Sequence, residues 1–271
     1  MTAAPRLSDE ALPAEPILLR ETEGPVATLT LNRPARYNAL SEEMLSALQE
    51  ALDEIAADEA IRVLVLAARG KAFCAGHDLK QMRARPEQDY YRALFAQCSR
   101  MMLTLTAMPQ AVIARVQGIA TAAGCQLVAT CDLAVAAEEA RFATSGINVG
   151  LFCSTPAVAV SRNLGRKRAF EMLMTGDFID AATAADYGLI NQAVPAEELD
   201  AAVAELAGKI ARKAPVAVRT GKQMFYRQLE RDLAGAYDFA AETMACNMMA
   251  DDTGEGIDAF IEKRPPRWHQ D

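Results

Sequence analysis

The chain has 271 residues, of which 51% are hydrophobic and 24% charged, with 28 Lys and Arg, 36 Asp and Glu, two His and six Cys. This composition is enough to bury a core and excludes wholesale disorder. The net charge of −8 argues against nucleic acid as the main partner, because phosphate binding needs cationic side chains that replace counterions. With many carboxylates and only two imidazoles, we expect acid/base chemistry to use Asp or Glu.

Targeting and metal signals are lacking in the sequence. No apolar stretch approaches the ~20 residues needed to span a bilayer, and the first residues contain no hydrophobic leader segment. We therefore expect neither membrane insertion nor export. The cysteines form no C-x-x-C pair and have no His at metal-ligand spacing, so no metal site is predicted. Reduced thiols in the cytoplasm are the simplest interpretation.

The N-terminal third predicts an arm, a hairpin and a helix. Residues 1–15 are rich in Pro, Ala and acids, which predicts a flexible arm. Two β-like runs, 17–22 and 26–31, are separated by a Gly-Pro turn signal and predict a hairpin. Ser41 is followed by apolar residues every three or four positions, which predicts a capped amphipathic helix.

Further along the chain, strands alternate with helices. Apolar and β-branched residues fill 61–68, as is typical of a strand buried on both faces. The run 111–118 leads into small residues and then a helical pattern, and the run 132–137 leads toward 140–150. From about residue 157 the pattern is mostly helical. The sum predicts an α/β core followed by a helical C-terminal portion.

Two strand-to-helix loops carry residues suited to chemistry. The first contains Gly76 and His77, and Asp78 is placed to cap the helix that follows. The second, 121–125, places small residues at another helix start. Backbone N–H groups at a helix start suit an oxygen that becomes negative, so two such loops form an oxyanion hole where they converge. If they do not converge, both are ordinary tight turns.

Several ordered motifs resemble the enoyl-CoA hydratase/isomerase (crotonase) superfamily, from about Pro16 to Trp268. These motifs are LNRPARYNAL (31–40), KAFCAGHDLKQM (71–82), GIATAAGCQLVATCDLAVA (118–136), ARFATSGINVG (140–150) and EMLMTGDFIDAATAADYGLINQAV (171–194). Within the superfamily, ATSGINVGLFCSTPAVA (143–159) and EGIDAFIEKRPPRW (255–268) are most similar to the subfamily of enoyl-CoA hydratase domain-containing protein three.

The resemblance implies a fold, an assembly and a ligand. The fold is the α/β crotonase (ClpP-like) spiral of ββα units, with an acyl-CoA pocket in a core at 16–200 and a helical trimerisation region at 201–271. The implied assembly is a trimer, or a hexamer built as a dimer of trimers. The ligand is an acyl-CoA thioester, for a lyase or isomerase of fatty acid metabolism. Coenzyme A then enters as part of the substrate, and no separate cofactor is implied.

The resemblance also implies site residues, each assigned by its position in one of these motifs. The oxyanion donors are the backbone N–H groups of His77 and Ala123. The imidazole of His77 is open to two interpretations, an acid/base group or a packing and capping residue at the pocket edge. The implied substrate-binding residues are Arg36, Tyr37, Ala75, Gly76, Leu79, Lys80, Gly124, Ser145, Phe260 and Lys263, with Lys80 and a neighbouring subunit's Lys263 at positions that meet the 3′-phosphate.

Both acids of the family's hydratases are replaced. Those enzymes use two glutamates, one to activate water and one to protonate the α-carbon. Gln126 stands at the first position and Gly146 at the second. An amide does not exchange protons usefully at pH 7, and glycine has no side chain. Ordinary two-glutamate hydration is therefore not expected.

Three interpretations follow. In the first, the protein is an enzyme that moves protons with another group, the candidates being Thr144, Ser145, Asn148, Cys153 and the His77 ring. In the second, it binds acyl-CoA without catalysis, and Gln126 is a hydrogen-bonding pocket residue. In the third, it is a thiol enzyme that pairs Cys74 with His77. If only the acids are missing, Gln126→Glu with Gly146→Glu should raise hydration.

Overall fold

The computed structural model describes residues 15–269, so most of the predicted arm, residues 1–14, lies outside the described residues. A six-stranded sheet contains, in spatial order, β1 (Leu18–Glu23), β2 (Val26–Leu31), β3 (Val63–Ala68), β5 (Ala111–Val116), β7 (Leu133–Ala137) and β10 (Gln192–Val194). A four-stranded sheet contains β4 (Ala72–Cys74), β6 (Ile119–Thr121), β8 (Arg141–Ala143) and β9 (Ile179–Asp180). The predicted hairpin is confirmed, because β1 and β2 pair antiparallel.

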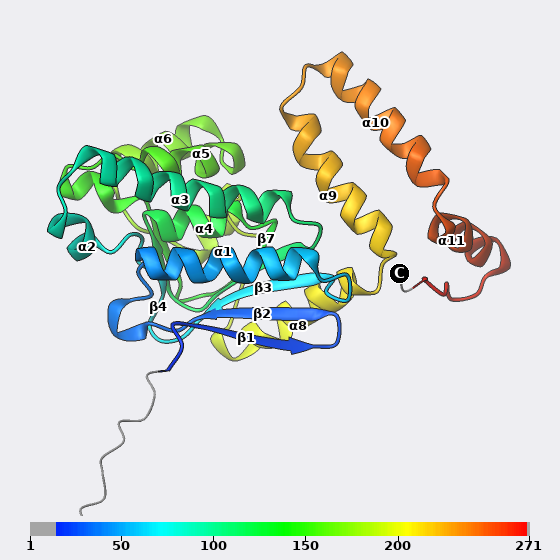
Figure 1. The fold of residues 1–271 in the computed structure, drawn as a ribbon, viewed down its shortest axis with the longest axis horizontal. Helices are drawn as coiled ribbons and strands as arrows, with labels where there is room; N and C mark the ends of the chain where they lie inside the picture. Colours follow the sequence, from blue (N-terminus) through cyan, green and yellow to red (C-terminus); the bar gives the residue numbers. More distant parts are fainter. Residues whose placement is uncertain (1–14, 270–271) are drawn as a thin grey trace, which may run out of the picture.

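The helices cover the sheets and then continue beyond them (Figure 1). They are α1 (Glu42–Ala57), α2 (Leu79–Ala84), α3 (Gln88–Ala107), α4 (Ala123–Thr130), α5 (Ser154–Asn163), α6 (Arg166–Thr175), α7 (Ala181–Tyr187), α8 (Leu199–Ala211), α9 (Pro215–Leu229), α10 (Leu233–Met248) and α11 (Asp251–Glu262). Short 3-10 turns are η1 (Pro34–Arg36), η2 (Ser145–Val149) and η3 (Ala196–Glu198). No helix in the described part of the chain is long and apolar enough to cross a bilayer.

The two predicted helix caps are confirmed. The Ser41 side chain accepts a hydrogen bond from the N–H of Met44 at the start of α1. Asp78 accepts from the N–H groups of Lys80 and Gln81 at the start of α2. Each cap satisfies backbone donors that have no acceptor within their own helix.

Helix α3 is missing from the sequence predictions, although the periodic signal is present. Its buried residues Tyr90, Leu94, Cys98, Met101 and Leu105 recur every three or four positions, which is the spacing of one helix face. Glutamines, arginines and threonines lie between these residues and dilute the apolar pattern. The helix packs against α1 and brings a side chain to the site described below.

Three successive ββα units form the core of the fold. In each unit the first strand (β3, β5 or β7) enters the six-stranded sheet, and the second (β4, β6 or β8) enters the four-stranded sheet. Neighbouring strands of successive units pair in parallel. Parallel strands end at the same edge of a sheet, so the loops after β4, β6 and β8 come together. This arrangement confirms the predicted crotonase spiral.

The six-stranded sheet is buried on both faces. Along β3, Val63 and Val65 pack toward α8, whereas Leu64 and Leu66 belong to the main core on the other face. Leu199 and Val203 of α8 join the first of these clusters, so the helix belongs to the core layer. The predicted boundary between residues 200 and 201 therefore falls within α8.

A buried ion pair attaches α9 to the core. The ammonium of Lys222 lies 2.7 Å from Asp132, and the Lys222 and Asp132 side chains are 6% and 14% exposed. The ammonium also donates to the carbonyls of Leu105 and Gln110, at 2.7 and 2.8 Å. The hydroxyl of Tyr226 donates to the second oxygen of Asp132 at 2.7 Å. All three donors of the lysine are satisfied, which is the condition for a buried charge to be tolerated.

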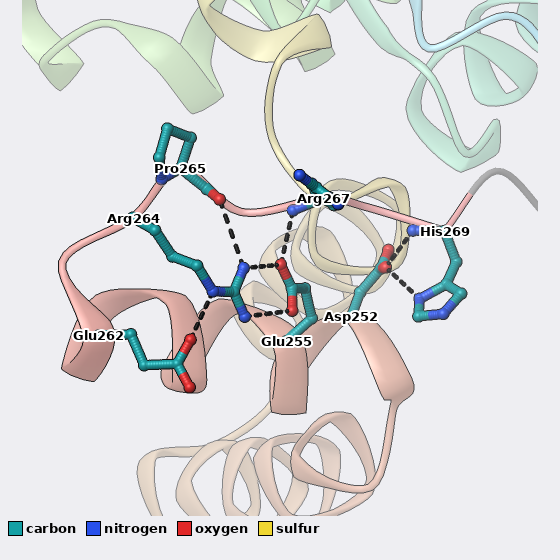
Figure 2. A network of polar contacts seen from close by, with 7 residues as sticks. All are labelled: Asp252, Glu255, Glu262, Arg264, Pro265, Arg267 and His269. Atoms are coloured by element: carbon teal, nitrogen blue, oxygen red, sulfur yellow. Dashed lines mark hydrogen bonds and ion pairs between the residues drawn. The ribbon is translucent and has the colours of Figure 1, made fainter.

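A second polar network folds the end of the described chain back onto α11 (Figure 2). Glu255 accepts two hydrogen bonds from the guanidinium of Arg264, at 2.6 and 2.9 Å. Asp252 accepts from the backbone N–H of His269 at 2.6 Å. The bidentate contact with Arg264 lowers the pKa of Glu255 to about 2, so this carboxylate stays charged at physiological pH.

Breaking the buried pair should destabilise the protein strongly. Lys222→Met leaves the Asp132 charge buried without its cation, and we expect a loss of about 3–5 kcal/mol in the free energy of unfolding. Urea titration monitored by circular dichroism measures this loss. Lys209→Met is the matched control, because Lys209 pairs with Glu205 on the surface and should cost less than about 1 kcal/mol. Equal losses in the two variants would contradict the assigned role of the buried pair.

Candidate active site

A cavity of about 210 Å³ opens where the three loops of the ββα units meet. The loops after β4, β6 and β8 contribute, in order, Ala75 and His77, Ala122 and Ala123, and Ser145 and Gly146. The remaining wall comes from α2, α3 and the segment leading into α5, through Leu79, Met82, Phe95, Val149, Leu151, Phe152, Cys153, Ser154, Thr155 and Pro156. None of these described lining residues is an Asp or a Glu.

The loop after β4 is held so that the N–H of His77 is free. Leu40 donates to the carbonyl of Gly76 at 2.8 Å and accepts from the N–H of Asp78 at 3.4 Å. In such a parallel bridge the two flanking peptide groups face the partner, so the N–H of His77 itself faces the other way. Within residues 15–269 this N–H has no acceptor.

The loop after β6 presents a second free N–H. Ala123 is the first residue of α4, where a backbone N–H has no acceptor within the helix. Ala122, just before it, has φ 51° and ψ −122°, a conformation that normally favours glycine. A Cβ built at Gly76 would lie 3.2 Å from the nitrogen of Ala123. The two loops are therefore in direct contact at one end of the cavity. They converge and are not two unrelated turns.

The glycines of these loops are required by close packing. Gly76 has φ +90°, and a Cβ there would come within 2.9 Å of the Ala122 side chain. A Cβ at Gly124 would overlap the carbonyl of Cys74 at the end of β4. Neither glycine lines the cavity itself, and what the structure shows for Gly124 is the close approach of α4 to β4; the contact of both glycines with substrate stays a prediction.

The His77 ring lies in the cavity wall without a hydrogen-bond partner. Both ring nitrogens are buried and unpaired among the described residues. The ring packs edge-on against Phe95 of α3, with centroids 5.4 Å apart. Burial lowers the pKa of the imidazole, because the charged form is desolvated. The ring is therefore neutral at pH 7, and neither of its buried nitrogens is engaged by a described residue.

The chain closes over Gly146, where the second glutamate would stand. A Cβ at Gly146 would lie 2.6 Å from the carbonyl oxygen of Leu151 and 2.8 Å from the sulfur of Cys153. The segment 151–153 thus occupies the space that a longer side chain would need. Gln126 is buried on α4, its side-chain oxygen is unpaired, and it does not line the cavity.

The other candidates for proton transfer differ in whether they line the cavity. The hydroxyl of Thr144 is buried and donates to the carbonyl of Met172 at 2.7 Å. Asn148 is outside the lining, and its amide donates to Gly176. Ser145 does line the cavity, and its hydroxyl lies 2.7 Å from that of Thr121. Cys153 also lines the cavity, as does the ring of His77.

The proposed Cys74–His77 pairing does not fit the geometry. Cys74 is fully buried in β4 and is not among the cavity residues. Burial raises the pKa of its thiol to about 12, so the thiolate needed for nucleophilic attack is absent at neutral pH.

The remaining predicted residues are not brought to the cavity of this chain. Arg36, Tyr37 and Lys80 lie exposed outside the lining. Phe260, near the end of α11, is 84% exposed, and Lys263 follows that helix. Figure 1 shows α10 and α11 standing away from the sheets.

Comparison with known proteins places the chain in a family. Residues 21–271 match the Enoyl-CoA hydratase/isomerase family. The chain belongs to that family. It is 45% identical over 249 residues to the rat protein named enoyl-CoA hydratase domain-containing protein 3, mitochondrial, covering 92% of this chain and 83% of the relative. The subfamily resemblance is thereby confirmed.

Two solved structures of this family are closely similar. A Mycobacterium smegmatis enoyl-CoA hydratase is 59% identical with a TM-score of 0.93, covering 94% of this chain and 100% of that one. Human enoyl-CoA hydratase domain-containing protein 3 is 42% identical with a TM-score of 0.91, covering 93% of this chain and 100% of that one. Both support the crotonase fold assigned above.

The prediction of a cytoplasmic protein is wrong by the same comparison. The relatives from rat, mouse, Xenopus laevis and human are all named as mitochondrial proteins. Unpaired cysteines were the physical argument for the cytoplasm, and they indicate a reducing environment without distinguishing one such compartment from another.

The apolar wall is the part of this family member's site that sequence reasoning missed. Phe95 belongs to the helix that was not predicted, and Met82 lies in a helix of six residues. Leu151 and Phe152 are large apolar residues that stay 46% and 41% exposed. An apolar pair just after the glycine-rich turn at Gly150 was the available signal.

Restoring both glutamates should not restore a hydratase. In the variant Gln126→Glu with Gly146→Glu, the second side chain meets the Leu151 carbonyl, and the first enters a buried position away from the cavity. We expect a lower melting temperature and no gain in hydration of crotonyl-CoA, followed by the loss of enone absorbance. Gly165→Glu is the comparison for added bulk, because a Cβ there meets nothing within 4 Å and the backbone φ of −57° is open to any residue. A stable double variant with raised hydration would show that only the acids are missing.

Proposed function

We propose that this protein binds an acyl-CoA thioester in the cavity and polarises its carbonyl between two backbone N–H groups. The observation that carries the proposal is the pair of free donors, from His77 and Ala123, on two loops in contact at one cavity. Donors that are fixed in advance stabilise the charge that develops on the thioester oxygen when its α-carbon or β-carbon reacts. Loss of one such donor typically costs ~10²–10³ in rate.

The apolar wall supports an acyl group as the rest of the ligand. Met82, Phe95, Leu151 and Phe152 contribute carbon surface, and no carboxylate or ammonium of the described residues faces it. Burial of each methylene in such a wall stabilises a complex by about 0.8 kcal/mol. At about 210 Å³ the cavity exceeds the ~150 Å³ of an apolar cavity that binds benzene, so it has room for a short or medium acyl chain.

Exposed cations supply a place for the phosphates of coenzyme A. Arg36 is the last residue of the 3-10 turn η1 and Lys80 lies in α2, and both are exposed. Lys80 is in the first turn of α2, whose neighbour Leu79 lines the cavity. Local positive charge of this kind is needed in a chain with a net charge of −8.

The proposed chemistry is that of a thioester enolate, in an enoyl-CoA hydratase or isomerase reaction without the two glutamates. A second candidate is an acyl-CoA-binding protein that does not catalyse. The absence of a carboxylate from the described lining and the closed space at Gly146 favour this second candidate. Turnover of crotonyl-CoA separates the two.

We also propose that α9 to α11 mediate self-association with further copies of this chain, as a trimer or hexamer. In the isolated chain α10 has no buried residue, and α9 has none apart from the Lys222 side chain described above. Large apolar side chains stay exposed on the last two helices and the residue between them: Leu233 76%, Tyr237 71%, Met244 71%, Met249 84%, Phe260 84% and Ile261 69%. Many exposed large apolar residues on neighbouring elements favour an interaction site.

A charge in the apolar wall should weaken acyl-CoA binding. Phe152→Asp removes carbon surface and adds a negative charge beside an anionic ligand, while the position is 41% exposed and tolerates a polar residue. We expect the dissociation constant for butyryl-CoA to rise at least about tenfold, a change of ~1.4 kcal/mol, by titration calorimetry. Phe170→Asp, at a 61% exposed position outside the cavity, should leave binding unchanged. No butyryl-CoA binding by the unaltered protein would refute the proposed function.

Charges on α10 should break the assembly. Tyr237→Glu with Met244→Glu puts two carboxylates into the exposed apolar surface, which makes its burial between copies costly. By light scattering after size exclusion, we expect the unaltered chain as a trimer or hexamer and the variant as a smaller species. Leu103→Glu, on α3 and 66% exposed, is the matched control and should keep the assembly. A monomeric unaltered chain would contradict the proposal.

A further inference from the structure

An imidazole and a thiol line the same cavity from different elements. His77 comes from the loop between β4 and α2, and Cys153 from the residue that precedes α5. The other described lining residues, from α2, α3, η2 and the start of α5, are apolar or carry only a hydroxyl. Among the described lining residues, the imidazole and the thiol are therefore the two groups that ionise within the ordinary pH range.

The Cys153 side chain fills the space beside Gly146 that a side chain of residue 146 would need. Its sulfur lies 2.8 Å from where a Cβ of Gly146 would be, so the thiol replaces a side chain from the 3-10 turn η2. Cys153 is also the N-cap of α5, with no side-chain hydrogen bond to that helix. A thiolate formed there is stabilised by the positive end of the helix and by the N–H of Gly146.

The protonation states of the two groups at pH 7 suit a general acid and a general base. Burial raises the pKa of Cys153 above its usual 9.0, so the thiol keeps its proton at pH 7. Burial lowers the pKa of His77 below its usual 6.5, so the imidazole is neutral and can accept one. Two neutral groups also avoid placing a fixed charge in an apolar wall.

We propose that His77 and Cys153 are the base and acid of this cavity and take the place of the missing glutamates. The inference rests on the proposed function and assigns catalytic residues to that same site. In hydration of a 2-enoyl-CoA, the imidazole takes a proton from water as the water oxygen bonds to C3. The C2=C3 pair becomes the C1=C2 bond of an enolate, and the carbonyl π pair moves onto the thioester oxygen, which the N–H groups of His77 and Ala123 stabilise.

The second half of the step restores both groups. The enolate collapses, C2 takes the proton of the Cys153 thiol, and the product is the 3-hydroxyacyl-CoA. The thiolate then recovers a proton from the imidazolium through solvent. One water is consumed, no oxidant or reductant is needed, and the protein ends in its starting protonation state. General acid and base groups of this kind each contribute typically ~10²–10⁴ in rate.

The experiment combines two variants, a control and two probes on the full-length protein. Crotonyl-CoA reports hydration by its enone absorbance, and butyryl-CoA in D₂O reports α-proton exchange by mass spectrometry. Cys153→Ser keeps the size of the side chain but removes the acidic thiol. His77→Gln removes the imidazole but keeps a polar side chain and the backbone N–H donor. Cys246→Ser, at an exposed cysteine on α10, is the matched control. Thermal melts and butyryl-CoA affinity verify folding and binding.

The pair predicts a bell-shaped pH profile for hydration. Activity should rise with pH through a midpoint below 6.5 as His77 loses its proton, and fall above about 9 as Cys153 does. His77→Gln should lower the rate ~10²–10⁴-fold and remove the acid limb. Cys153→Ser should lower it by a similar factor and remove the alkaline limb, while Cys246→Ser changes neither. Butyryl-CoA affinity should stay within about threefold in all variants.

Each contrary result has a distinct meaning. Hydration that persists in folded His77→Gln or Cys153→Ser overturns the pair. Binding of butyryl-CoA without hydration or α-proton exchange by the unaltered protein also overturns it, but leaves the acyl-CoA-binding function standing. No binding of either thioester refutes the proposed function itself, and the pair with it.

Discussion

The parallel pairing of three short strands is the constraint on which the site depends. β4, β6 and β8 have only three residues each, yet they end at one edge and bring together loops that are 48 and 22 residues apart, from Ala75 to Ala123 and on to Ser145. Close approach of the strands needs glycine at positions such as Gly124, where a Cβ would overlap the neighbouring backbone. The two free N–H groups converge because of this packing.

The apolar character of the cavity follows from what surrounds those loops. Helix α3 and the segment 151–153 cover the opening with carbon and close the space beside Gly146. A carboxylate in such a wall would be desolvated and would need a partner that the wall does not contain. A site with a neutral imidazole and a neutral thiol is consistent with that environment. The hydrogen-bond donors are backbone N–H groups, which are themselves uncharged.

Local rules predicted the elements whose signals are local. The Ser41 and Asp78 caps, the hairpin and the buried strand β3 all depend on residues within a few positions of one another. Helix α3 and the strands β4, β6 and β8 were not assigned individually. A strand of three residues has too few side chains to show an alternation, and it is defined by the strands with which it pairs.

The sequence alone determined the family, and it predicted two loops with backbone donors at helix starts and the replacement of the family's glutamates by Gln126 and Gly146, because these are identities of residues at motif positions. Only the tertiary structure decided that the loops meet, that Gln126 lies outside the cavity lining, and that the Cys153 sulfur lies beside Gly146, which has no side chain. Those facts depend on distances between segments far apart in the chain. Such distances are set by sheet register and close packing, which no single motif contains.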